Sequence, residues 1–178
     1  MGFPCGLVSG GDEAEGLVCV GDEYVPLKSH QYALWLALGR PGNPDADAFL
    51  QERYRDSDTP DSVMDLLRLG LLVRLSGDPA KDQPALKRMR LHLLAVGIGR
   101  GNGDGSKMFF APSQGRMVGL EPAVYFVLIR AHNEQSLWDL CTHCASDLNL
   151  EVDELVETVL GALPDMLGTD SAFLDRVG

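Results

Sequence analysis

The sequence predicts a helix-rich α+β protein made of two similar units, which a connector and a β-hairpin join. Three observations support this prediction. The chain has 178 residues, 45% of them hydrophobic, which is enough for a core in one domain or in two small ones. Short β-type runs alternate with segments whose apolar residues recur at helical spacing. The same order of elements returns after roughly 91–93 residues. A single mixed α/β domain is the main alternative.

A β-hairpin is predicted at the start of the first unit. Leu17–Val20 and Tyr24–Leu27 are short β-type runs on either side of Gly21 and Asp22, which are residues typical of tight turns. An apolar helix then begins at Ser29, and Gly39 ends it.

Two more helices and a strand are expected to complete this unit. The first of them is predicted from Asp45 to Tyr54. The next begins after Asp58-Thr59-Pro60, a favourable helix cap, and ends at Gly70. Leu71–Leu75 follows as an apolar run of the length and composition of a strand.

A polar segment with two prolines separates the units. We expect a connector there, followed by a β-hairpin around a Gly-rich turn. The predicted elements are a short helix near Ala85–Arg90 and strands at Leu91–Ile98 and Lys107–Ala111.

The second unit is predicted to hold three helices. They begin at Glu121-Pro122, at Ser136 and at Val152. Asp139 lies three residues after Ser136, which makes an imperfect capping box. Pro164 and Gly168 are expected to terminate the third helix, because proline interrupts helical hydrogen bonding and glycine favours helix ends.

Three segments carry a resemblance to a known fold: the strand-like Tyr24–Leu27, the helix that contains Trp35, and Leu66–Leu75 with its ending RLGLLVRL. Together they resemble tandem winged-helix proteins. The first half is also similar to the small peptide-binding winged helices of peptide-modifying pathways, which bind an extended peptide beside a strand. The second half departs from the pattern where Pro164 and Asp165 replace the expected strand.

The resemblance implies two winged-helix-like units. Their expected bounds are residues 17–76 and 117–178, with the connector and hairpin over residues 77–116 between them. Residues 1–16, rich in Gly, Asp and Glu, are expected to form a flexible leader.

Charge argues against the commonest role of a winged helix, which is DNA binding. The chain has a net charge of −11, and the stretch from Ala131 to Asp175 holds ten Asp or Glu residues and no Lys or Arg. Cations supply most of the affinity for DNA by neutralising phosphates. We therefore expect weak binding to random duplex DNA. Mimicry of DNA by this acidic stretch stays open as a minor alternative.

A basic cluster keeps a DNA-binding regulator as the first alternative function. It lies in the expected wing and connector, where a solvated loop is the simpler interpretation. Besides Arg74, its possible nucleic-acid contacts are Lys81, Lys87, Arg88 and Arg90.

The favoured function is that of a non-catalytic adaptor or regulatory protein which binds a protein or peptide, a second copy of itself included. An edge strand offers free N–H and C=O groups to an extended peptide. The strand expected after the third helix provides the candidate partner-binding residues: Arg68, Leu71, Val73, Arg74 and Leu75. The two arginines would suit an acidic peptide.

The sequence CTHC at residues 141–144 is the most specific motif of the chain. Two thiols at this spacing suit zinc or a redox couple, but one such pair supplies only half of a tetrahedral site. Cys5 and Cys19 could supply the other two ligands, but both lie near the start of the chain, where a flexible leader is expected. Cys141 and Cys144 also share a helix face with apolar neighbours, which favours core packing. No metal or cofactor is therefore predicted, and the two thiols remain weak candidates.

No enzyme signature is present in the sequence, so an enzyme whose site is dispersed along the chain is the second alternative. The Gly-rich loop at residues 97–105 lacks the spacing of a phosphate loop and precedes a strand-like run. The histidines show no metal-ligand spacing: they are His30, His92, His132 and His143. No apolar run approaches the roughly 20 residues of a membrane span. The first residues also lack the features of a secretion signal, so a cytoplasmic protein with reduced thiols is expected.

Overall fold

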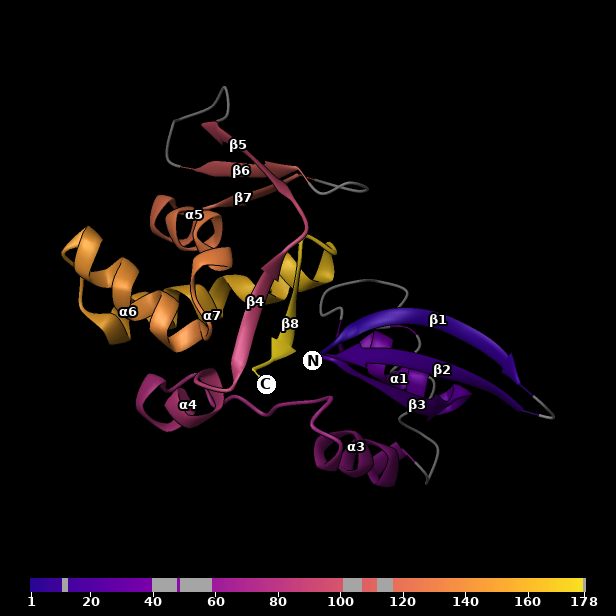
Figure 1. Ribbon diagram of the computed structural model, residues 1–178. Helices are drawn as coiled ribbons and strands as arrows, with labels where there is room; N and C mark the ends of the chain where they lie inside the picture. The colour runs from indigo at the N-terminus through magenta and orange to yellow at the C-terminus, as the bar shows by residue number, and fades with distance from the viewer. Residues whose placement is uncertain (11–12, 40–47, 49–58, 101–106, 112–116, 178) are drawn as a thin grey trace. The chain divides into compact units, whose positions relative to one another are not determined.

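The computed structural model describes residues 1–10, 13–39, 48, 59–100, 107–111 and 117–177 (Figure 1). The chain forms two compact units, Met1–Arg74 and Leu75–Val177. Both combine helices with small antiparallel sheets, so the α+β class is confirmed. The residues expected to form a connector and hairpin belong to the second unit.

Unit 1 begins with a three-stranded antiparallel sheet in the order β1-β2-β3. Its strands are β1 (Phe3–Gly10), β2 (Glu13–Val20) and β3 (Glu23–Lys28). The predicted β2–β3 hairpin is confirmed, and Gly21 has a φ of 56° in its two-residue turn. Residues 1–16, which were expected to form a flexible leader, lie mostly in β1 and β2.

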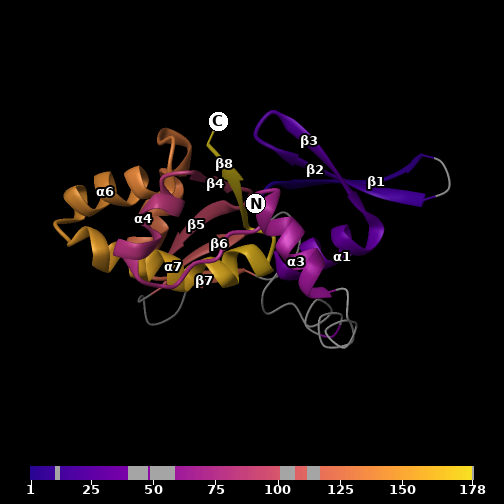
Figure 2. The same cartoon turned by 90° about the horizontal axis from the view of Figure 1, so that it is seen from below.

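One helix packs directly on the sheet of unit 1, and a second helix packs on the first. The first, α1 (Ser29–Leu38), follows β3 directly and packs against β2 and β3. The second, α3 (Thr59–Arg68), packs against α1 (Figure 2). Both were predicted. The helix expected from Asp45 to Tyr54 lies outside the described residues, apart from Ala48. The core between these elements includes Val18, Val20, Leu27, Leu34, Trp35 and Leu66.

The prediction of a strand at Leu71–Leu75 is wrong. Gly70 has a φ of 69°, and the N–H groups of Leu71 and Leu72 both donate to the carbonyl of Leu66. This geometry caps the end of α3. The carbonyl of Leu71 accepts a hydrogen bond from the indole Nε1 of Trp35, at 3.3 Å, and another from the amino group of Met1. Because these interactions occupy its backbone and its side chain is fully buried, Leu71 serves as a core anchor.

Unit 2 contains two small antiparallel sheets. One has the order β5-β6-β7, and the other pairs β4 with β8. The strands are β4 (Met89–Leu93), β5 (Val96–Arg100), β6 (Met108–Ala111), β7 (Val118–Leu120) and β8 (Ala172–Arg176). The predicted hairpin at the Gly-rich turn is confirmed as β5–β6. The single strand expected at Leu91–Ile98 is divided between β4 and β5.

The helices of unit 2 pack on one another and on these sheets (Figures 1 and 2). They are α4 (Pro79–Leu86), α5 (Pro122–Ile129), the 3₁₀ turn η1 (Ala131–Asn133), α6 (Leu137–Leu148) and α7 (Val152–Gly168). The predicted start of α5 is confirmed. Ser136 caps α6, as predicted: its hydroxyl accepts a hydrogen bond from the backbone N–H of Asp139 at 3.1 Å.

Two of the expected helix positions in unit 2 are wrong. The short helix near Ala85–Arg90 lies earlier, as α4, because the Asp78 carboxylate accepts hydrogen bonds from the first backbone N–H groups and Pro79 suits the first turn. Pro164 does not interrupt α7, so this part of the prediction is wrong, but the helix does end at Gly168, as predicted. The buried side chains of Leu163 and Met166 hold the helix on the core across this proline.

The two units share a local arrangement, in which a tyrosine of the helix after the sheet packs closely on a glycine of a strand. A Cβ atom on Gly16 would lie 2.1 Å from Cγ of Tyr32, and one on Gly97 would lie 2.5 Å from the hydroxyl of Tyr125. Tyr32 and Tyr125 are matched by the repeat seen in the sequence. At Gly16 any side chain would therefore collide with Tyr32 close to the backbone of α1, whereas at Gly97 the tyrosine hydroxyl would have to move.

Replacing Gly16 by alanine should destabilise unit 1 by about 1–3 kcal/mol, since an overpacked core must shift. Gly161→Ala in α7 is a control for which we expect the opposite effect on stability. Its Cβ would meet no atom within 4 Å, so alanine should stabilise the helix by about 0.5–1 kcal/mol. Both changes in stability would be measured by urea unfolding. For Gly16→Ala, Trp35 fluorescence reports on unit 1 in a background in which Trp138 is replaced by Phe. For Gly161→Ala, circular dichroism reports on unfolding. Equal stability of Gly16→Ala and the parent protein would contradict the close packing.

A buried carboxylate fixes the turn before α4. Asp82 accepts hydrogen bonds from the backbone N–H and the hydroxyl of Ser76, each at 2.9 Å, and from the N–H of Gly77 at 2.8 Å. Burial alone would raise the pKa of Asp82, but these hydrogen bonds outweigh it and lower the pKa below its ordinary value. The charged form therefore holds this turn.

Asp82→Asn should destabilise unit 2 by about 1–3 kcal/mol at neutral pH, because an amide donor then faces backbone donors. Since the folded-state pKa is lowered, this stabilisation is present above the pKa of the unfolded chain and is lost as the pH falls through the folded-state pKa. The difference between parent and variant in urea unfolding should thus shrink on acidification. Asp78→Asn, which keeps a good helix cap, should change stability little. A difference that does not depend on pH would disprove the role of the charge.

Candidate functional site

The expected partner-binding residues do not form a continuous strand. Arg68 is exposed at the end of α3, where its guanidinium Nη1 lies 3.2 Å from Oδ1 of Asp65. Leu71 is buried, Val73 is half-buried and Arg74 is exposed. Leu75 belongs to unit 2. The structure therefore keeps Arg68 and Arg74 on the surface but offers no strand between them for a peptide to pair with.

The basic residues proposed to contact nucleic acid are not equally available. Lys81 forms an ion pair with Asp78, with Nζ and Oδ2 2.6 Å apart, and this hydrogen bond raises the pKa of Lys81. Arg90 donates from Nη2 to the carbonyl of His132 at 3.4 Å. Of these four residues, Lys87 and Arg88 are the exposed ones that form no ion pair with the described residues.

The helices α3 and α7 carry acidic groups on their surfaces. Asp61 of α3 is exposed, and Asp65 pairs with Arg68. In α7 the exposed carboxylates are Asp153, Glu154, Glu157 and Asp165. These helices would repel a phosphate backbone if they were to lie in a DNA groove.

Among the residues that the structure describes in unit 1, β3 has an open strand edge. In the order β1-β2-β3 only one side of β3 pairs with another strand of the sheet. Val20 and Glu23 face each other across the two-residue turn. In such a hairpin this first pair is hydrogen-bonded, and hydrogen-bonded pairs then alternate with non-hydrogen-bonded pairs along the two strands. It follows that Val25 and Leu27 pair with β2. Tyr24 and Pro26 direct their backbone groups outward.

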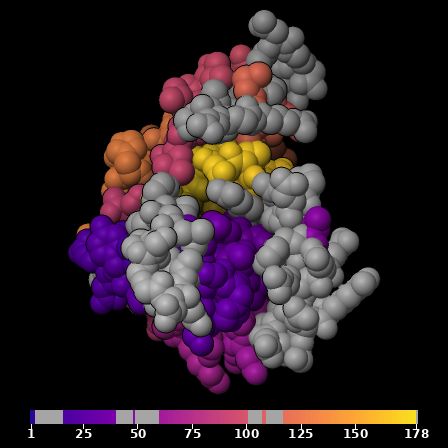
Figure 3. All heavy atoms as spheres, turned by 90° about the vertical axis from the view of Figure 1, so that its right-hand side faces the viewer, coloured from indigo at the N-terminus to yellow at the C-terminus, as the bar shows by residue number. Residues whose placement is uncertain are grey.

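Two further observations agree with this orientation of β3. Pro26 has no N–H, and proline occurs in strands where the missing donor would face away from the ladder. The N–H of Lys28, the next outward position, donates to the side-chain Oε1 of Gln31 at 3.3 Å. The side chain of Tyr24 is 66% exposed. Figure 3 shows indigo and violet residues of unit 1 at the molecular surface. The outer edge of β3 therefore presents the N–H and C=O of Tyr24, the C=O of Pro26 and an aromatic ring.

Cys141 and Cys144 pack into the core of unit 2, as predicted, and each is about 1% exposed. Burial raises the pKa of Cys141 to about 12, with a contribution from the neighbouring Cys144. Burial also raises the pKa of Cys144, which the nearby Arg130 partly opposes. Both groups are thus held as thiols, the form that is poorest as a nucleophile or metal ligand.

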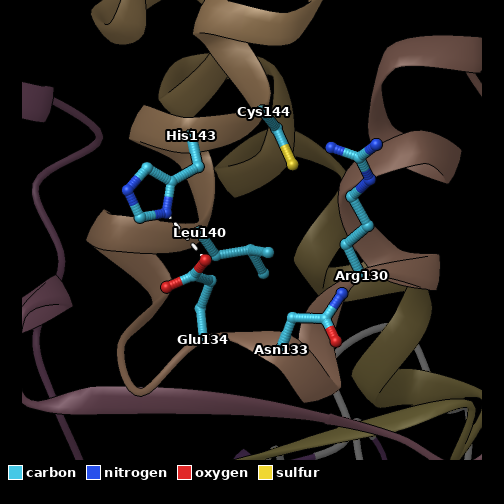
Figure 4. Close-up of a pocket in the computed structure, with 6 residues that line it drawn as sticks. All are labelled: Arg130, Asn133, Glu134, Leu140, His143 and Cys144. Carbon is cyan, nitrogen blue, oxygen red and sulfur yellow. Dashed lines mark hydrogen bonds and ion pairs between the residues drawn. The ribbon is translucent and has the colours of Figure 1, made fainter.

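His143 lies off this buried face, beside a small pocket (Figure 4). The pocket has a volume of about 180 Å³ and is lined by Arg130, Asn133, Glu134, Leu140, His143 and Cys144. Nδ1 of His143 lies 2.7 Å from Oε1 of Glu134. Nη1 of Arg130 pairs with Oδ2 of Asp147, and its guanidinium lies 4.1 Å above the ring of Phe126.

No group of three or more potential metal ligands occurs among the residues that the structure describes. The turn at residues 101–106 between β5 and β6 lies outside these residues. Within the described part of the chain, no helix is both long and apolar enough to span a membrane. Comparisons with protein-family models, with curated proteins and with solved structures find no match to this chain.

Sequence reasoning missed the outer edge of β3 and the polar pocket. A signal for the first was present in Pro26, because proline within a β-type run indicates an edge strand. The pocket had no such signal. Its charged residues come from the turn after α5 and from α6, and only the fold brings Arg130 and Glu134 near His143.

Thiol labelling tests the assignment of the cysteines. In a Cys5→Ser background, half-buried Cys19 should react readily with Ellman's reagent at pH 8. Cys141 and Cys144 should react only on unfolding, since with a pKa of about 12 only about one Cys141 in ten thousand is ionised. Denaturant should release both thiols together. Fast labelling of either one in the folded protein, or stoichiometric zinc by elemental analysis, would refute core packing.

Proposed function

We propose that this protein is a non-catalytic adaptor or regulatory protein that binds an extended polypeptide at the outer edge of β3. One observation carries the proposal: Tyr24 and Pro26 direct backbone groups away from the sheet, on a strand whose second side pairs with no strand in the described part of the chain. An extended chain can add to such an edge and pair with these groups. The exposed ring of Tyr24 would contact its side chains.

The similarity of the first half to peptide-binding winged helices supports the same function. That similarity implied a strand as the place of binding, and β3 now replaces Leu71–Leu75 in that role. A winged-helix arrangement of the two units is part of this proposal. Pro26 limits the number of hydrogen bonds that the edge can make, so we expect a short contact centred on Tyr24.

Electrostatics supports a polypeptide partner over nucleic acid. The helices α3 and α7 carry exposed carboxylates. Of the four basic candidates, Lys81 is engaged with Asp78 and Arg90 with the carbonyl of His132. Backbone pairing at an edge strand needs no phosphate neutralisation. A second copy of this chain is one partner that such an edge can bind.

Tyr24→Pro tests the proposal, because it removes an outward N–H that β2 does not use. Twelve-residue peptides would be selected on the isotope-labelled protein from a displayed random library. Their binding is expected to shift the backbone amide signals of Tyr24 and Lys28. We expect Tyr24→Pro to weaken binding about three- to tenfold, since it removes one backbone N–H donor and a single hydrogen bond contributes about 0.5–1.5 kcal/mol.

Tyr24→Val is the matched control, because it keeps the N–H and removes only the ring. It should bind more tightly than Tyr24→Pro, and circular dichroism should show both variants folded. Equal affinity of the two variants would exclude backbone pairing at this edge. Selected peptides that shift only signals of unit 2 would move the binding site away from β3.

A further inference from the structure

The pocket between η1 and α6 has the chemistry of a ligand site that is separate from the edge of β3. Its floor consists of Leu140 and Cys144, both buried. Its rim is polar, and Figure 4 shows the Glu134 carboxylate with His143 on one side and the Arg130 guanidinium on the other. The side chain of Asn133 lies on the rim between them. Opposite charges therefore face one small apolar floor.

Neighbouring groups hold both charged side chains in position before any ligand arrives. Arg130 is fixed by Asp147 and by the ring of Phe126. A guanidinium has five N–H donors, so the pair with Asp147 leaves others for a ligand. Glu134 is fixed by His143 through Oε1, and its Oε2 has no hydrogen bond with the described residues.

Asn133 adds a polar group that the folded chain does not use. Its side-chain amide makes no hydrogen bond within the described part of the protein. A guanidinium beside a free amide is a suitable pair of donors for a carboxylate. The carboxylate of Glu134, across the pocket, is a suitable acceptor for an ammonium group.

We propose that this pocket binds a free α-amino acid. A ligand with only a carboxylate would be repelled by the negative charge of Glu134, and a ligand with only an ammonium group would be repelled by the positive charge of Arg130. A zwitterion satisfies both sides at once, and its side chain would lie on Leu140 and Cys144. The volume of about 180 Å³ suits such a small molecule and lies below the range typical of drug-sized ligands.

Binding would be measured on the full chain by titrating each of the common amino acids and following amide and arginine side-chain signals by NMR. Every amino acid that binds would be compared with two analogues, the acid without its amino group and the amine without its carboxylate. We expect saturable shifts at Arg130, Asn133 and His143, with at least tenfold weaker binding of either analogue. An analogue that binds as well as the amino acid would overturn the proposal, as would no saturable shift from any amino acid at 10 mM.

Variants test which residues hold the ligand. Arg130→Gln and Glu134→Gln should each weaken binding at least tenfold, and Asn133→Ala should weaken it less. Arg88→Gln and Glu157→Gln remove the same charges from exposed positions elsewhere in unit 2 and should leave affinity unchanged. Should Arg130→Gln fail to fold by circular dichroism, Glu134→Gln decides, since it leaves the pair of Arg130 and Asp147 intact. Unchanged affinity in Glu134→Gln would overturn the proposal.

Discussion

Close packing of a helix on a short sheet is the constraint on which each unit depends. A three-stranded sheet of this size has little apolar surface of its own, so it needs a covering helix to form a core. Gly16 and Gly97 provide the space for Tyr32 and Tyr125. In unit 1 the bond from Trp35 to the carbonyl of Leu71 then ties the end of α3 to the same core.

Local chemistry explains most of what the sequence predicted correctly. The start of α5 at Pro122, the cap of α6 by Ser136 and the turn at Gly21 each depend on residues within three or four positions. The errors arise where distant contacts decide the structure. Leu71 has the composition of a strand residue, yet Leu66 and Trp35 occupy its backbone. Pro164 is a helix breaker by itself, yet the burial of its neighbours carries α7 past it.

The candidate sites divide in the same way, into features that depend on local spacing and features that depend on distant contacts. Exposure of the acids on α7 and burial of the two thiols on α6 could be predicted, because helical spacing decides which face a residue takes. The pocket near His143 could not, since it requires the turn after α5 to meet α6. Pro26 is a sequence signal for an edge strand at β3, but which side of β3 is open follows only from the order of the strands.

The position of the boundary between the units also bears on how the protein folds during synthesis. Unit 1 is contiguous up to Arg74, so its described sheet and helices can assemble while unit 2 is still being translated. Unit 2 cannot do the same, because β4 pairs with β8, and these strands lie about eighty residues apart in the chain. Until Ala172–Arg176 has left the ribosome, β4 lacks its partner strand, and this half of the nascent chain is the one with greater need of chaperone protection.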